Sequence, residues 1–127
     1  MRWILTEDKF WRVQMSLENL LSNDLLFHDG LLHEVHFCLG RKKEKTVLDM
    51  DLYKTYQDPK RVRFRFTVSK PARVILALDY DEHRKHQFAG VISDGTFIKG
   101  EDFDCLRLYI CGGYIEFTGK KINAKEI

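Results

Sequence analysis

The first apolar pattern in the chain has the period of an α-helix. Between residues 6 and 25, apolar side chains recur at steps of three or four residues, which places them along one face of a helix. These residues are Phe10, Val13, Leu17, Leu21 and Leu25. Thr6 is a suitable N-cap, and Glu7 and Asp8 follow it where the helix dipole favours negative charge. The pattern predicts an amphipathic helix over about 6–25, which either covers a sheet or enters the groove of a partner.

From residue 31 onward the period changes to two, which is typical of half-buried strands. Apolar and polar residues alternate over 31–39, 48–52 and 61–68, and a further strand is predicted over 74–78. The alternation is clearest over 61–68, where three arginines alternate with apolar residues. The tripeptide 28–30 and the segment 69–72, which contains Pro71, are predicted turns.

Two glycine-containing dipeptides predict hairpins closer to the C-terminus. Asp94-Gly95 separates 91–93 from 96–98, and Gly112-Gly113 separates 108–111 from 114–117. Both dipeptides accept the positive φ angles of a two-residue turn. The charged segment 79–86 is expected to be a loop, and residues 119–127 are expected to add an edge strand or to fray.

The order of these elements predicts the fold class. Because the strands follow one another through short turns and no second helical pattern offers a parallel crossover, antiparallel pairing is expected. The predicted fold is α+β: one N-terminal amphipathic helix (about 6–25) packed on a mainly antiparallel, curved sheet or open barrel of six to eight strands. A single domain is expected over 1–127, with a β-rich region at about 31–118 and a C-terminal tail at 119–127.

Composition and charge narrow the class of protein. The chain has 127 residues, of which 44% are hydrophobic and 31% charged, as in a globular domain. The formal net charge of +2 is too balanced to favour nucleic acid on bulk charge. Cys38, Cys105 and Cys111 are odd in number and lack CxxC spacing, which favours thiols in a reducing compartment. Without a signal-peptide pattern or an apolar run near the ~18 residues of a membrane span, we expect a cytoplasmic protein with no membrane partner.

One candidate polar site comprises His28, Asp29 and His33. Imidazole and carboxylate groups bind zinc or iron and also serve as general acids and bases. The alternation around His33 is that of a strand, so His33 and His36 are expected on opposite faces, where they cannot share a metal ion. His33 is therefore predicted to be a buried, hydrogen-bonded side chain, with acid–base chemistry or metal binding as the alternatives.

The second candidate site is the arginine set Arg61, Arg63 and Arg65. Guanidinium groups on one face of a strand bind phosphate or carboxylate groups. Asp49 and Asp51 are expected on the same outward face of the preceding strand, where cross-strand ion pairs would stabilise the sheet. Structural pairing, a protein-binding surface and a nucleic-acid surface are three interpretations of the pattern. These five residues are the predicted partner-binding residues.

The familiar catalytic and cofactor motifs are absent from the sequence. It contains no GxGxxG, GxxxxGK[ST], HExxH or GxSxG. We therefore predict no catalytic residue, cofactor or metal ion, while a nucleophile assembled from distant segments is compatible with the sequence. The sequence carries no signal for an oligomeric state.

Residues 27–37 carry a family resemblance. The segment Phe-His-Asp-Gly-Leu-Leu-His-Glu-Val-His-Phe resembles the opening of small bacterial β-rich proteins, in which an aromatic-His-Asp triplet follows an N-terminal helix and starts the first strand. Some of these resemble immunity proteins of toxin systems, and others are uncharacterised. The resemblance implies a stoichiometric binder that masks a toxin, with no catalysis and no cofactor. Immunity proteins against nuclease toxins are often strongly acidic. The slightly basic charge of this chain departs from that pattern and does not favour a nuclease toxin as the partner.

The sequence thus favours a small non-catalytic protein-binding module over an enzyme, with an immunity-type protein as its specific form. One alternative is a small-molecule-binding protein or enzyme with a cavity in the curved sheet, using His28, Asp29 and His33. The other, less favoured alternative is a nucleic-acid-associated domain that uses the arginine set.

Overall fold

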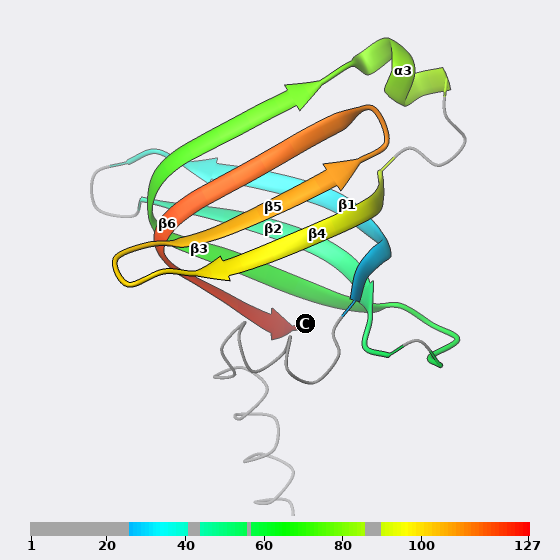
Figure 1. Cartoon of the computed structure of the whole chain (residues 1–127), viewed down its shortest axis with the longest axis horizontal. Coiled ribbons are helices and arrows are strands. Elements are labelled where there is room, and N and C mark those ends of the chain that lie inside the picture. The colour runs from blue at the N-terminus through cyan, green and yellow to red at the C-terminus, as the bar shows by residue number, and fades with distance from the viewer. Residues whose placement is uncertain (1–25, 41–43, 56, 86–89) are drawn as a thin grey trace, which may run out of the picture.

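Six strands make up most of the described chain. The structure is a computed structural model that describes residues 26–40, 44–55, 57–85 and 90–127. Its strands are β1 (Leu26–Cys38), β2 (Lys45–Tyr53), β3 (Val62–Leu78), β4 (Val91–Lys99), β5 (Asp104–Ile110) and β6 (Gly113–Glu126) (Figure 1). Within the described residues one helix, α3 (Tyr80–Lys85), follows β3. No helix in this part of the chain is long and apolar enough to cross a membrane.

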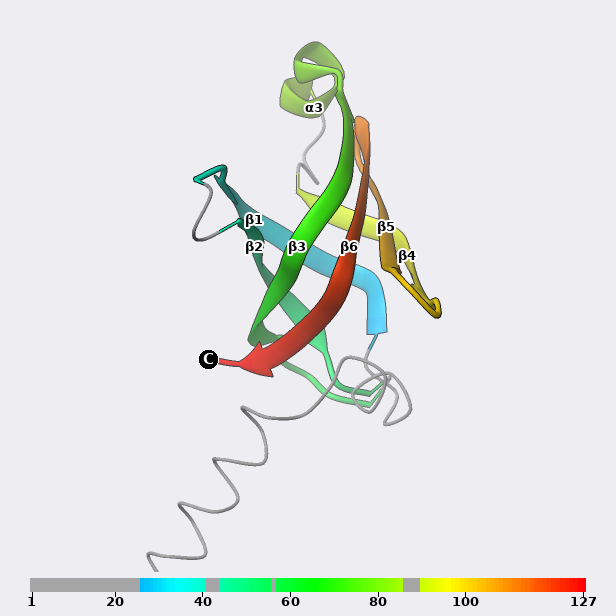
Figure 2. The ribbon, with the colours of Figure 1, turned by 90° about the vertical axis from the view of Figure 1, so that its left-hand side faces the viewer.

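The strands form a closed barrel in the order β1-β2-β3-β6-β5-β4, and all neighbours are antiparallel. The closure between β1 and β4 is short, because it consists of the pairs Gly30–Ile92 and Leu31–Val91. β3 and β6 are the two longest strands and pair along almost their full length. Figure 2 shows both strands bending as they pass from one layer of the barrel to the other. β3 therefore belongs to two layers, first beside β2 and then as the outermost strand beside β6.

The core lies between these layers and is filled by alternate side chains of the strands. The largest fully buried side chains are Phe64, Phe66, Phe117, Leu48, Met50, Leu52, Ile92, Leu106, Leu108, Ile122 and Val68. The ring of Phe27 joins them from the start of β1, with its centroid 6.0 Å from that of Phe66. Each large apolar side chain that is fully removed from water stabilises the fold by about 1.5–3 kcal/mol. The period-two pattern of the sequence thus sets which residues form the core.

The predicted α+β class is wrong. The described residues are nearly all antiparallel β-sheet, and their one helix has six residues. The helix predicted over about 6–25 lies outside the described residues. A closed barrel fills its interior with side chains from its own strands, so its sheet does not need a helix to cover an apolar face. Antiparallel pairing is confirmed. The predicted curved sheet or open barrel is instead a closed barrel of six strands.

Two predicted turns are wrong because the chain bends there without reversing. β3 passes through 69–72, where its register with β6 shifts between Pro71 and Arg73. β4 likewise runs through Asp94-Gly95. A Cβ atom at Gly95 would lie 2.6 Å from Cγ of Phe27, so this glycine permits the close approach of a core ring. The segment 79–86, predicted to be a loop, contains α3.

The second predicted hairpin is confirmed, but its two-residue turn is Cys111-Gly112 and not Gly112-Gly113, because Gly113 pairs with Ile110 as the first residue of β6. β5 and β6 pair from Ile110–Gly113 to Asp104–Gly119, and Gly112 in the turn has a φ of 80°. Beyond Gly119, β6 continues to Glu126 and pairs with the first half of β3. Among the described strands this last segment pairs with β3 alone, so the predicted tail forms an edge strand and the β-rich region extends past 118.

Candidate functional site

The predicted arginine and aspartate residues meet on the outer face of β2 and β3. The strand register places Arg65 opposite Asp49 and Arg63 opposite Asp51. Arg65 donates two hydrogen bonds to Asp49, from Nε to Oδ1 at 2.8 Å and from Nη2 to Oδ2 at 3.0 Å. Arg63 donates from Nε to Oδ1 of Asp51, and its Nη2 lies 3.4 Å from Oδ2. We call these four residues the ion-pair ladder.

Hydrogen bonds within the ladder favour the charged forms of all four groups. The bonds from Arg65 are the largest cause of a lowered pKa at Asp49, and those from Arg63 are the largest cause at Asp51. The same bonds raise the pKa of Arg63 and of Arg65. Each guanidinium is therefore matched by one carboxylate, and the ladder adds no net charge to the surface. This balance favours the structural interpretation of the pattern and removes the surplus positive charge that a phosphate backbone would require.

His33 extends the ladder onto β1 and lies at the surface. Its Nε2 is 2.7 Å from Oδ2 of Asp51, and its side chain is 36% exposed. The prediction of a hydrogen bond is confirmed, whereas the prediction of burial is wrong. The register between β1 and β2 shifts between Leu32 and Glu34, and this irregularity turns both His33 and Glu34 outward. His36 is exposed on the same face, so the predicted placement of His33 and His36 on opposite faces is also wrong.

Arg61, His28 and Asp29 lie close together at the start of β1. Arg61 donates from Nε to the backbone oxygen of Asp29 at 2.8 Å, and its guanidinium carbon lies 5.0 Å from the centre of the Tyr53 ring. His28 Nδ1 lies 2.7 Å from the backbone oxygen of Ser93, and this bond is the main reason that the pKa of His28 is raised. The predicted turn at 28–30 lies within β1, where Asp29 has a φ of 64°. His28 Nε2 also lies 3.4 Å from Oδ2 of Asp29, so the structure brings these two residues of the predicted polar site together, whereas His33 contacts Asp51.

A cavity of approximately 360 Å³ opens between the second half of β1 and the end of β3. Its apolar lining includes the side chains of Leu32, Val35, Phe37, Leu76 and Leu78. We call this set the open corner. Phe37 is 46% exposed and Leu76 is 55% exposed, although both belong to alternating strand patterns. His33 and Glu34 also line this cavity, so the open corner and the ion-pair ladder are adjacent.

The open corner exists because β3 extends beyond the last residue that pairs with its neighbour β2. β2 pairs with β3 only as far as the pair Lys45–Ser69, whereas β6 accompanies β3 to Leu78. Over 71–78, β3 has one paired neighbour among the described strands, and Figure 1 shows it as the outermost strand of its layer. β1 likewise pairs with β4 only at Gly30 and Leu31. The inward side chains beyond these limits therefore lack a facing strand and remain partly in water.

A second polar cluster was not predicted from the sequence. Glu116 on β6 is only 9% exposed at its side chain, and it accepts hydrogen bonds from Arg107 Nε at 2.7 Å and from the Tyr114 hydroxyl at 2.6 Å. Arg73 Nη2 lies 3.6 Å from its other oxygen, and the ring of Tyr109 is centred 5.0 Å from that of Tyr114. The predicted hairpin could not have given these pairs, because a turn at Gly112-Gly113 places Tyr109 opposite Glu116. The observed turn instead places Arg107 opposite Glu116 and Tyr109 opposite Tyr114.

The same contacts explain the protonation of the Glu116 cluster. The Tyr114 hydroxyl, followed by Arg107, lowers the pKa of Glu116 by hydrogen bonding to its carboxylate. In return, the carboxylate of Glu116 raises the pKa of Tyr114 to about 12, because a phenolate would lose the hydrogen bond and be repelled. The cluster therefore combines an ionised carboxylate, a neutral tyrosine and two arginines.

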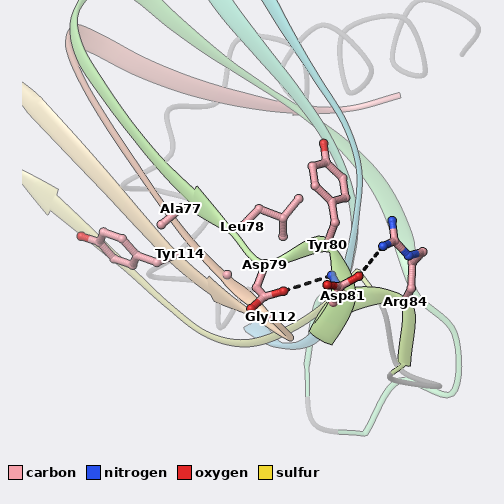
Figure 3. Close-up of a pocket in the computed structure, with 9 residues that line it drawn as sticks. Ala77, Leu78, Asp79, Tyr80, Asp81, Arg84, Gly112 and Tyr114 are labelled. Carbon is pink, nitrogen blue, oxygen red and sulfur yellow. Dashed lines mark hydrogen bonds and ion pairs between the residues drawn. The ribbon is translucent and has the colours of Figure 1, made fainter.

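A second, shallow depression lies where β3 meets α3, beside the turn between β5 and β6 (Figure 3). Its polar groups are used by local structure. Asp79 Oδ1 accepts from the backbone N–H groups of Asp81 and Glu82 and so caps α3. Asp81 in turn accepts from Arg84 at 2.5 Å, as the dashed line in Figure 3 marks. Asp79 is thus the cap of this short helix, and Asp81 in its first turn is paired with Arg84.

The described residues contain no group of three or more His, Cys, Asp or Glu side chains placed to hold a metal ion. Cys38, Cys105 and Cys111 lie on β1, on β5 and just after β5, and each is partly buried. Two polar clusters in the described residues are the ion-pair ladder with His33 and the Glu116 cluster.

Comparison with known proteins identifies a fold and no family. No family model matches the sequence, and no curated protein matches it. The structure is similar to the crystal structure of an uncharacterised protein from Neisseria gonorrhoeae, with a TM-score of 0.57 and 16% sequence identity. The match covers 81% of this chain and 96% of that one. At this identity the similarity shows the fold alone.

Proposed function

We propose that this chain is a non-catalytic protein-binding module whose contact surface is the open corner with the ion-pair ladder at its rim. The observation that carries the proposal is the exposure of Phe37 and Leu76 around a cavity lined by apolar side chains. A protein that folds alone rarely leaves large apolar side chains grouped at an opening, and such groups mark sites for partners or ligands. A partner that filled the open corner would complete the burial that the ends of β1 and β3 lack.

The arrangement around the open corner has the anatomy of a protein–protein interface. Such interfaces have an apolar centre surrounded by a polar rim. Here His33 and Glu34 line the cavity and face the ladder, and His33 is bonded to Asp51. Arg63, Arg65 and Asp49 extend the rim, so the predicted partner-binding residues keep a role in the proposal. Arg61 immediately precedes β3, and its side chain donates to the backbone oxygen of Asp29.

The partner is a protein, and the class we propose is a toxin masked by stoichiometric binding. This step rests on the resemblance of residues 27–37 to small bacterial β-rich proteins, some of which resemble immunity proteins. The proposed compartment is the cytoplasm, which the three cysteines without CxxC spacing support. The ion-paired state of the ladder arginines supports a protein partner over nucleic acid.

The test is affinity capture from nuclease-treated lysate of the native host, read by mass spectrometry. The bait is used as the wild type, as Leu76→Lys and as Ile98→Lys. Ile98 is a matched control, because it is an exposed aliphatic residue (43%) on β4 that does not line the cavity. We expect one stoichiometric protein with the wild type and Ile98→Lys, and its loss with Leu76→Lys. Equal capture by all three baits, or no protein with any, contradicts the proposal, provided that urea midpoints show all three baits folded.

A second function is favoured by the size of the cavity. Its volume of approximately 360 Å³ lies within the range of about 300–1,000 Å³ typical of small-molecule sites. Of the predicted polar residues His28, Asp29 and His33, only His33 lines it. Native mass spectrometry of protein purified from the host distinguishes the two functions: a bound small molecule that Val35→Trp displaces supports a ligand site, whereas an unmodified mass supports the protein-binding module.

A further inference from the structure

We propose that the partner binds through an extended segment that adds as a strand to the open edge of β3. This inference rests on the proposed function and specifies its binding mode. Over 71–78, β3 is paired with β6 on one side, from Pro71–Gly119 to Leu78–Gly113, and with no described strand on the other. In an antiparallel sheet a strand directs alternate backbone N–H and C=O groups to each side. The open side of β3 therefore offers a row of backbone groups to an incoming strand.

The sequence of this edge favours addition. Proteins usually protect an open strand edge with charges, prolines or bulges. In β3 these devices, Lys70, Pro71 and the register shift before Arg73, all lie where the edge begins. The rest of the edge, residues 74–78, reads Val-Ile-Leu-Ala-Leu and carries no charge. The edge is thus protected against strand pairing where it begins, and it carries no such protection over 74–78, beside the cavity.

The geometry also specifies the chemistry of the added segment. Its alternate side chains would enter the open corner beside Leu76 and face Phe37, so they are apolar. The side chains between them would lie on the outer face beside Ile75 and Arg73, since these residues pair with Glu116 and Thr118 on that face. Arg73 is 68% exposed and only reaches 3.6 Å from Glu116, whose carboxylate already accepts from Arg107 and Tyr114. An acidic residue near one end of the segment would therefore complement Arg73.

The experiment uses a synthetic probe, which makes it independent of the partner's identity. The probe is an eight-residue peptide, blocked at both ends, that alternates Val or Leu with Thr and has one Glu near an end. Its control has the same side chains with N-methyl groups on alternate backbone amides, in two versions offset by one residue. Residue-resolved amide exchange is measured on the full chain with each peptide, and sedimentation reports whether the chain dimerises through this edge instead.

We expect the unmodified peptide to slow exchange at alternate amides of 72–78, and one N-methylated version to lose this effect. Arg73→Glu should weaken binding of the Glu peptide by about fivefold or less and favour a Lys version, as for an exposed ion pair. Unchanged exchange over 72–78, equal binding of all peptides, or a dimer that occupies the edge would overturn strand addition. If the captured partner still requires Leu76 in that case, the proposed function stands and only its binding mode fails. If Leu76→Lys has no effect on the partner either, both fail.

Discussion

The two halves of β3 have the same alternating pattern and different surroundings. In the first half, Phe64, Phe66 and Val68 point inward between β2 and β6 and are buried. In the second half, Leu76 belongs to the same alternation and is 55% exposed, because β2 has ended and β6 is the one described neighbour. The alternation of a strand determines which side chains face inward. The number of neighbouring strands determines whether they are buried, and the unburied half is where a partner can bind.

The largest expected effect is a difference in stability between substitutions of inward-facing residues in the two halves of β3. Phe66→Ala should lower the free energy of unfolding by about 3–5 kcal/mol, because it leaves a cavity among fully buried neighbours. Leu76→Ala should cost less than about 1 kcal/mol, since water already reaches that side chain. Urea unfolding of both variants measures the difference. Similar losses in the two variants would mean that the second half of β3 is as well covered as the first.

The next effect concerns the outer face beside the second half of β3. Glu116→Ala removes the acceptor of both Arg107 and Tyr114 at a side chain that is 9% exposed. We expect it to lower the free energy of unfolding by about 1–2 kcal/mol. Glu116→Gln is the matched control: it keeps an acceptor oxygen without the charge and should cost less. A neutral result for Glu116→Ala would show that the cluster does not stabilise the hairpin of β5 and β6.

Tyr114 should make the fold sensitive to alkaline pH. Its pKa in the folded protein is raised to about 12, whereas an unfolded tyrosine ionises near ~10. The stability it contributes is present below about pH 10 and is lost as pH rises toward 12, because only the unfolded chain then gains from ionisation. Urea midpoints measured from pH 9 to 12 should fall less steeply in Tyr114→Phe. Parallel curves for the variant and the wild type would refute this role.

The smallest expected effect is an acid dependence in the first half of β3. Arg65 lowers the pKa of Asp49 in the folded protein, so Asp49 contributes stability above the pKa of an unfolded aspartate, near ~4. That contribution is lost as pH falls through the folded value, where the carboxylate is protonated and its bonds to Arg65 weaken. Asp49→Asn should flatten the fall of stability below about pH 4. An acid profile identical to that of the wild type would show that the pair does not contribute to stability.

The sequence predicted the parts of this fold that depend on alternation and on local turn chemistry. The shared outward face of the two arginines and two aspartates of the ion-pair ladder follows from the period-two pattern, and the structure confirms it, whereas the individual pairs are set by the strand register. The hairpin at Gly112 follows from the backbone freedom of glycine. Asp94-Gly95 has the same turn signal, but the turn predicted from it is wrong. Gly95 instead accommodates the ring of Phe27, which is a contact between residues far apart in the sequence.

The candidate site was less predictable because it depends on where pairing stops. No local pattern shows that β2 begins only at Lys45, so that β3 continues to Leu78 beyond its last pair with β2. The exposure of His33 depends on a register shift in its pairing with β2, and the sequence of β1 reads as regular alternation. The Glu116 cluster also depends on register, because the predicted turn at Gly112-Gly113 would pair Glu116 with Tyr109, whereas the observed hairpin pairs it with Arg107.

The measurement that tests the central claim most directly is calorimetric titration of the captured partner against the folded chain and two variants. Leu76→Lys places a charge in the open corner, and Ile98→Lys places the same charge on the outer face of β4. We predict that Leu76→Lys weakens binding by at least about 30-fold, as expected for a central interface residue, while Ile98→Lys leaves it nearly unchanged. Equal affinity of Leu76→Lys and the wild type would contradict the assignment of the open corner as the binding surface.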